Sequence, residues 1–311
     1  MVQVDVFWGY GWGASMAVAA GRRLARHKTP WESKYHVDTI LFLALSWAPT
    51  GLLLLIQHPS WETMQAARDF AHIPAWLTLL FGITNVTQGL LGFWVGRWLI
   101  GKEKIDWAHL NWIFGYFGMF FILLYGWDGL GYDRFLYDRD MLPGSPAWTP
   151  GVGTAAGVLP AIGHFLTSSV AITLYIDGVW LLPPFFYLFS KWLRENARDQ
   201  GVAEPGYGAI LRSYLFGVFG VGFAAAAVCA LMTRGAAYLF GVPDHVLRGL
   251  GEAAPHTGGH VAAYFLGLPT GLGVMYFGWW RNGMLGHRLL APLRLEKSDD
   301  DRASSTAVSQ A

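Results

Sequence analysis

Two histidines near the carboxyl end of the chain have the spacing of a shared metal site. His256 and His260 are four residues apart, so on a helix they lie on one face. Two imidazoles placed in this way can bind one zinc or iron ion. Pro255 precedes the pair and Gly258 and Gly259 lie within it, which leaves room for a ligand or a neighbouring helix. The pattern therefore predicts a metal site at His256 and His260.

Further side chains can complete such a site. His72 or His164 can supply a third nitrogen, and Asp128 can supply a carboxylate that binds the metal or orients a ligand. A metal with three protein ligands keeps a position open for water or substrate, as catalysis requires. We therefore predict Asp128 as a catalytic residue of a membrane metalloenzyme, a hydrolase or an oxidoreductase, acting on a lipophilic small molecule.

Two other functions suit the same residues. The first is electron transfer by haem b, with His72, His164 and His260 as candidate ligands, for instance His164 and His260 from facing helices. A second haem would then lie between His36 and His109. Simple hydrogen bonding at the membrane surface also explains single histidines at helix ends.

The third function is proton-coupled transport. Asp177 lies inside an apolar segment, and intramembrane carboxylates are costly enough to be functional candidates. We therefore also predict Asp177 as a catalytic or transport residue. Asn85 and Gln88 share one face of their segment and either line a path with Asp177 or join two helices.

The elements that position these residues are apolar helices. The chain has 311 residues, of which 53% are hydrophobic and 14% charged, whereas soluble domains carry about 25% charged residues. A helix needs about 20 apolar residues to cross a bilayer. Seven segments meet this requirement: Val2 to Ala20, Val37 to Gln57, Ile73 to Val95, Trp107 to Trp127, Pro160 to Leu188, Ser213 to Thr233 and Gly258 to Trp280. The sequence predicts an all-α, polytopic membrane bundle.

The distribution of basic residues predicts the orientation of this bundle. Lys and Arg accumulate on the cytoplasmic side of membrane proteins. Most of the 22 Lys and Arg residues lie in alternate connections and in the tail, which would all be on one side of the membrane. The residues on the other side would be Arg68, Arg134, Arg139, Arg234 and Arg248. We therefore predict an outer N-terminus and a cytoplasmic C-terminus. With this orientation the outer ends of the helices carry His58, His72, His164, His256 and His260, with Asp128 at the same level.

The fifth segment is longer than one crossing requires. From Pro160 to Trp192 it would extend about 50 Å if fully helical. It therefore either tilts and protrudes, or breaks near Asp177 and Gly178 or near Pro183 and Pro184. The charge pattern favours a single crossing.

A second polar group is predicted at the cytoplasmic ends of the helices. Because its members are close to basic residues and turns, we expect solvated helix ends. They are Glu32, His36, Asp38, Glu103, Asp106, His109 and His287.

Composition also predicts how the chain is divided into a membrane domain and a tail. We predict one transmembrane domain over residues 1–297 and a disordered cytoplasmic tail over 298–311, whose polar residues cannot bury a core. The expected location is a plasma membrane of the bacterial inner-membrane type.

The charge and the cysteine count exclude several functions. A net charge of +1 with no clustered basic surface argues against nucleic acid as a partner, and the single Cys229 excludes a disulfide framework. Phosphate-loop, dinucleotide-binding and G-x-S-x-G motifs are absent.

The predicted seventh helix has features that bear on two seven-helix families. His256 and His260 on the last helix are similar to the HxxxH of metal-dependent hydrolases of the alkaline ceramidase kind. The Ser and Asp that accompany this motif have no matching positions here. Retinal-binding rhodopsins need a Lys on the seventh helix for a Schiff base, and here Lys297 lies in the tail.

Overall fold

The computed structural model describes residues 2–57, 75–124, 179–228 and 291–293, with the isolated residues 159, 160, 162, 163, 239 and 273. Every regular element in these residues is a helix, which confirms the all-α prediction. In chain order they are α1 (Val2–Ala20), η1 (Gly21–Arg26), η2 (Pro30–Glu32), α2 (Lys34–Gln57), α3 (Ala75–Gly101), α4 (Ile105–Leu124), α8 (Leu182–Asp199), α9 (Tyr207–Arg212), η5 (Ser213–Gly220) and η7 (Ala291–Leu293).

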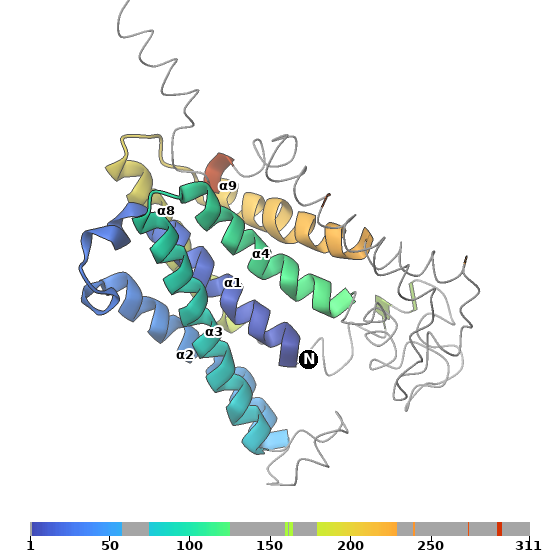
Figure 1. Cartoon of the computed structure of the whole chain (residues 1–311). Helices are drawn as coiled ribbons and strands as arrows, with labels where there is room; N and C mark the ends of the chain where they lie inside the picture. The colour runs from blue at the N-terminus through green and yellow to red at the C-terminus, as the bar shows by residue number, and fades with distance from the viewer. Residues whose placement is uncertain are drawn as a thin grey trace, which may run out of the picture.

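Helix α1 lies at the centre of the described bundle. It packs against α2, α3, α4 and α8, and in Figure 1 it runs between the α2 and α3 pair and α4. Its residues from Gly11 to Ala20 are all buried. Such a position suits a helix of Gly, Ala, Ser and Trp, because small residues allow neighbouring backbones to approach closely.

Glycines set the distance between α1 and α3. A Cβ atom added at Gly13 would lie 1.7 Å from the carbonyl oxygen of Gly89, and one at Gly92 would lie 2.3 Å from the carbonyl oxygen of Tyr10. Gly9 similarly faces the backbone of Asn85. Neither helix could hold a larger residue at these points without separating from the other, so the small residues determine which helices pack together.

Aromatic side chains fill the space beside α1. The Trp12 ring lies edge-on to Phe185 of α8, with 4.0 Å between the ring centroids. Trp12 also contacts Phe42 of α2 and Tyr116 of α4. This cluster joins four helices at the middle of α1.

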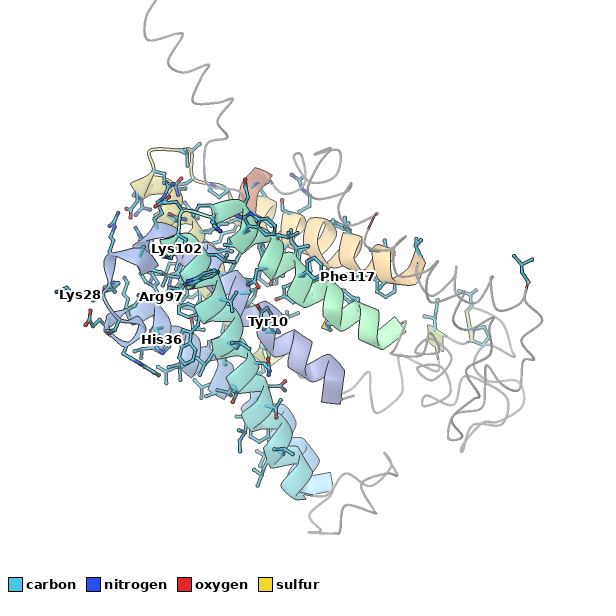
Figure 2. All side chains as sticks on the ribbon, in the orientation of Figure 1. Tyr10, Lys28, His36, Arg97, Lys102 and Phe117 are labelled. Carbon is cyan, nitrogen blue, oxygen red and sulfur yellow. The ribbon has the colours of Figure 1, made fainter. Side chains whose placement is uncertain are left out.

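The basic connections meet at one end of the bundle. The α1–α2 connection, the α3–α4 turn, the α8–α9 connection and η7 lie together in Figure 1, and Lys28, Arg97 and Lys102 mark the same end in Figure 2. We call it the basic end. The loops that the sequence assigned to one side of the membrane therefore lie at one end of the described structure.

Helix α8 includes the end of the predicted fifth segment. A turn at Leu181 precedes it, and Pro183 and Pro184 occupy its first turn, where proline is tolerated. Val179 and Trp180 before it are also helical, and Leu181 keeps a right-handed helical backbone, so a break near these prolines stays a prediction. Because Phe185 packs against Trp12, α8 begins inside the bundle and runs to the basic end.

Candidate functional site

The predicted outer site lies outside the described residues. This applies to all of its members: His72, His164, His256, His260, Asp128 and Asp177. Helix α3 begins shortly after His72, and α4 ends shortly before Asp128. The metal and haem assignments at these positions therefore stay predictions.

The described ranges do contain polar side chains, but not a metal centre. Within them, no group of three or more His, Cys, Asp or Glu side chains is arranged to hold a metal ion. The polar groups of this part of the chain instead include ion-pair clusters, a buried histidine and a buried tyrosine pair.

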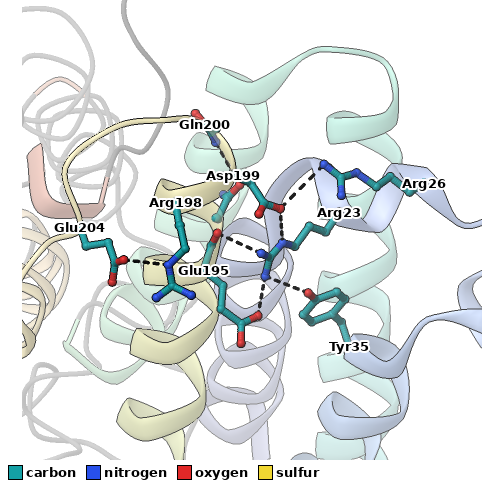
Figure 3. A network of polar contacts seen from close by, with 9 residues as sticks. Arg23, Arg26, Tyr35, Glu195, Arg198, Asp199, Gln200 and Glu204 are labelled. Atoms are coloured by element: carbon teal, nitrogen blue, oxygen red, sulfur yellow. Dashed lines mark hydrogen bonds and ion pairs between the residues drawn. The ribbon is translucent and has the colours of Figure 1, made fainter.

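Arg23 is the centre of the ion-pair network at the basic end (Figure 3). Its Nε donates to Asp199 Oδ2 at 2.6 Å, and its Nη1 donates to Tyr35 Oη at 3.0 Å and to a Glu195 carboxylate oxygen. Its Nη2 donates to the Glu195 carbonyl oxygen at 3.0 Å. One guanidinium thus joins η1, α2 and α8, and only 15% of its side chain is exposed.

The same end holds a second ion-pair cluster between α8 and the segment that follows. Glu204 accepts hydrogen bonds from Arg198 Nε at 2.8 Å and from Arg194 Nε at 3.1 Å. These bonds fix the turn that leads into α9. The hydrogen bond from Arg198 lowers the pKa of Glu204.

Acid should weaken the Arg23 network. The hydrogen bond from Arg23 lowers the pKa of Asp199 below its ordinary value. A lowered folded-state pKa adds stability above the unfolded-state pKa, roughly pH 4, and that stability is lost as the pH falls through the folded-state value. Between neutral pH and roughly pH 3, wild-type protein should therefore lose more thermal stability than Asp199→Asn protein. Equal losses in the two melting series would contradict this assignment.

His36 is buried, which corrects the expectation of a solvated helix end. Its side chain has 0% exposure and lies edge-on to Trp31 and stacked on Trp94, with ring centroids 4.4 and 5.9 Å apart. Neither ring nitrogen has a hydrogen-bond partner among the described residues. Burial, followed by the charge of Arg97, lowers the pKa of His36, so the ring is held neutral.

His109 lies in a different environment from His36. Its Nδ1 donates to the Ile105 carbonyl oxygen at 2.9 Å, and its ring lines a small cavity with Val18, Gly21 and Asn196. The neighbours of His36 belong to η2 and α3, so these two histidines do not face one another. The described geometry gives no support to a second haem between them.

Two tyrosine hydrogen bonds join helices of the described bundle, and sequence analysis missed them. Tyr116 of α4 and Tyr214 of η5 are fully buried and share a hydrogen bond between their hydroxyl groups. Tyr10 of α1 donates to Asn111 Oδ1 of α4. In a chain with 13 tyrosines single members do not stand out, but Asn111, a polar residue inside an apolar segment, was an available signal.

The comparisons with known proteins place the chain in a family. A family model described as an uncharacterized membrane protein family matches residues 104–296. A protein of Archaeoglobus fulgidus, described as an uncharacterized protein, is 33% identical over 202 residues, which cover 62% of this chain and 80% of that protein. The chain belongs to this membrane protein family. No solved structure matches it.

The family region begins at the α3–α4 turn and therefore excludes α1, α2 and α3. Of the predicted outer residues it includes Asp128, His164, Asp177, His256 and His260, and it leaves out only His72. Membership in a membrane protein family agrees with the predicted location in a lipid bilayer. The family description names no cofactor, ligand or reaction.

One helix in the described residues is long and apolar enough to cross a membrane. It runs from Tyr207 to Val228, with a mean hydropathy of 1.6, and it combines α9, η5 and the helical turns that follow. It overlaps the predicted sixth span. The count of seven spans stays a prediction.

Proposed function

We propose that this family member is a seven-span membrane protein whose outer face carries a metal-dependent catalytic site for a lipophilic substrate. His256 and His260, with His164 or His72, bind zinc or iron in this proposal. Asp128 supplies the carboxylate beside the metal, and the bound metal supplies an activated water or an open redox position.

One observation carries the proposal. Helices α1, α3 and α8 end at the basic end, whereas α2, α4 and α9 begin there. The chain therefore passes from α2 to α3, and leaves α4, at the opposite end of the bundle. If basic residues face the cytoplasm, His72 and Asp128 belong to the outer side, where the predicted seventh span places His256 and His260.

Metal and pigment analysis of purified full-length protein tests the proposed site. We expect stoichiometric zinc or iron, lost in the His256→Ala and His260→Ala double variant. The matched control is His27→Ala at the basic end, which should retain the metal. Metal that persists in the double variant, or a wild-type protein with neither metal nor pigment, would contradict the proposal. A Soret band would replace it with the haem alternative.

Labelling of introduced cysteines tests the orientation separately. In a Cys229→Ala background, a cysteine at Lys102 should react only with reagent supplied from the cytoplasmic side. A cysteine at Asp128 should react only from the outside. Reaction of both cysteines from one side would reject the proposed topology, whatever the metal content.

A second candidate function is proton-coupled transport through Asp177. Pro183 and Pro184 in the first turn of α8 favour it, because membrane helices interrupted by proline commonly form the substrate and ion sites of transporters. Asp177 lies a few residues before these prolines. In proteoliposomes, Asp177→Asn should abolish voltage-driven proton uptake, whereas Asp106→Asn at the basic end should not. Absence of uptake in the wild type would reject this candidate.

A further inference from the structure

A groove of about 450 Å³ opens between α1, α3 and α4. Its volume falls within the range of small-molecule sites, which is about 300 to 1,000 Å³. Its walls are mainly apolar, and the Trp107 and Phe114 side chains are exposed beside it. The lining residues are Tyr10, Leu99, Trp107, Leu110, Asn111, Phe114 and Gly115.

The groove has one polar point. Asn111 accepts the Tyr10 hydroxyl through Oδ1, while its Nδ2 is buried and has no hydrogen-bond partner among the described residues. An unsatisfied buried donor is unfavourable. Asn111 lines the groove, so Nδ2 is an unsatisfied donor beside any acceptor that binds there. A ligand with a carbonyl oxygen matches this donor.

The α3–α4 turn connects two groove-lining residues, Leu99 and Trp107, and carries two exposed lysines. Lys102 and Lys104 lie exposed in the α3–α4 turn, between Leu99 and Trp107 of the groove lining. The carboxylate of Glu103, in the same turn, is paired with Arg22 at 2.9 Å. Figure 2 labels Lys102 in this turn, and Lys104 follows it in the sequence, so two lysines of the turn are available for an anion.

These groups follow the depth profile of a membrane lipid. Tryptophan favours the headgroup level of a bilayer, and Asn111 is one helical turn deeper than Trp107, about 6 Å along the axis. Phe114 and Gly115 lie about one further turn along α4. In this direction the groove presents cations, then a hydrogen-bond donor, then an apolar surface.

We propose that this groove binds one anionic glycerophospholipid. The lipid phosphate pairs with Lys102 and Lys104, an acyl ester carbonyl accepts a hydrogen bond from Asn111 Nδ2, and the acyl chain lies on Leu110, Phe114 and Gly115. The inference rests on the membrane location of the family and is independent of the proposed metal site.

Native mass spectrometry of delipidated full-length protein with phosphatidylglycerol tests the groove. We expect one lipid to bind more tightly than the rest. Leu110→Trp should weaken this first binding event about tenfold by filling the groove, and Asn111→Leu should weaken it about fivefold by removing the donor. Leu91→Trp, at an exposed leucine of α3 outside the groove, is the matched control and should bind as the wild type does.

Two further binding measurements identify which part of the lipid the groove recognises. The Lys102→Gln and Lys104→Gln double variant should lose the preference for phosphatidylglycerol over phosphatidylcholine. Glycerol 3-phosphate, which has no acyl chain, should not compete. If Leu110→Trp or Asn111→Leu fails to fold, the lysine variant decides the question, since its side chains are exposed. Wild-type lipid preference in the lysine variant, or wild-type affinity in a folded Leu110→Trp variant, would overturn the proposal.

Discussion

Replacement of Gly13 by alanine is expected to disrupt the bundle, although it adds a single methyl group. The new Cβ would lie 1.7 Å from the Gly89 carbonyl oxygen, so α1 and α3 must separate. Overpacking of a tight interface costs about 1 to 3 kcal/mol or more, and here a rigid backbone group is displaced, so we expect about 3 kcal/mol. The loss opposes helix propensity, because alanine favours a helix over glycine by about 1 kcal/mol.

The melting temperature of purified protein in detergent measures this effect. Gly208→Ala is the matched control, because a Cβ at Gly208 of α9 meets no atom within 4 Å. This variant should melt at or above the wild-type temperature. A Gly13→Ala protein as stable as Gly208→Ala would show that α1 and α3 are not packed through their glycines.

The helices themselves were predictable because a long apolar run has few alternatives in a bilayer. Every backbone polar group there must be satisfied within the chain, which selects helices. The predicted first span, Val2 to Ala20, agrees with α1. The end of α3 does not agree with the predicted Val95, since the helix continues to Gly101. Arg97, which interrupts the apolar run, lies within the helix and donates to the His27 carbonyl oxygen at 2.9 Å, a contact that the hydropathy pattern does not indicate.

The environment of His36 was not predictable from its neighbours in the chain. Lys34 and Asp38 lie beside it in sequence and suggested contact with water. Trp31 of η2 and Trp94 of α3 instead enclose the ring. Only the packing of α2 on α3 brings these tryptophans together. The sequence likewise indicated the sidedness of the basic residues but not their partners, which come from helices far apart in the chain.

Arg23 shows the same difference between a charge pattern and a structural role. As part of a basic cluster it indicated only the orientation of the chain, yet it holds Glu195, Asp199 and Tyr35. We expect Arg23→Gln to destabilise the protein by about 2 kcal/mol. Loss of one partner from a buried ion pair costs about 3 to 5 kcal/mol, and partial exposure of the two carboxylates, 21% and 30%, reduces that value.

Arg26→Gln separates the role of Arg23 from the removal of a positive charge. Arg26 lies in the same helix η1, its side chain is 68% exposed, and it reaches Asp199 only at 3.8 Å. Exposed ion pairs contribute about 0 to 1 kcal/mol, so this variant should melt close to the wild type. The two variants carry the same net charge, and a difference in thermal stability between them therefore reports the hydrogen bonds of Arg23.

The acid sensitivity assigned to Asp199 should also decrease in Arg23→Gln and persist in Arg26→Gln, because Arg23 makes the largest contribution to lowering the pKa of Asp199. Equal melting temperatures and equal acid profiles for the two variants would show that the network does not hold η1, α2 and α8 together.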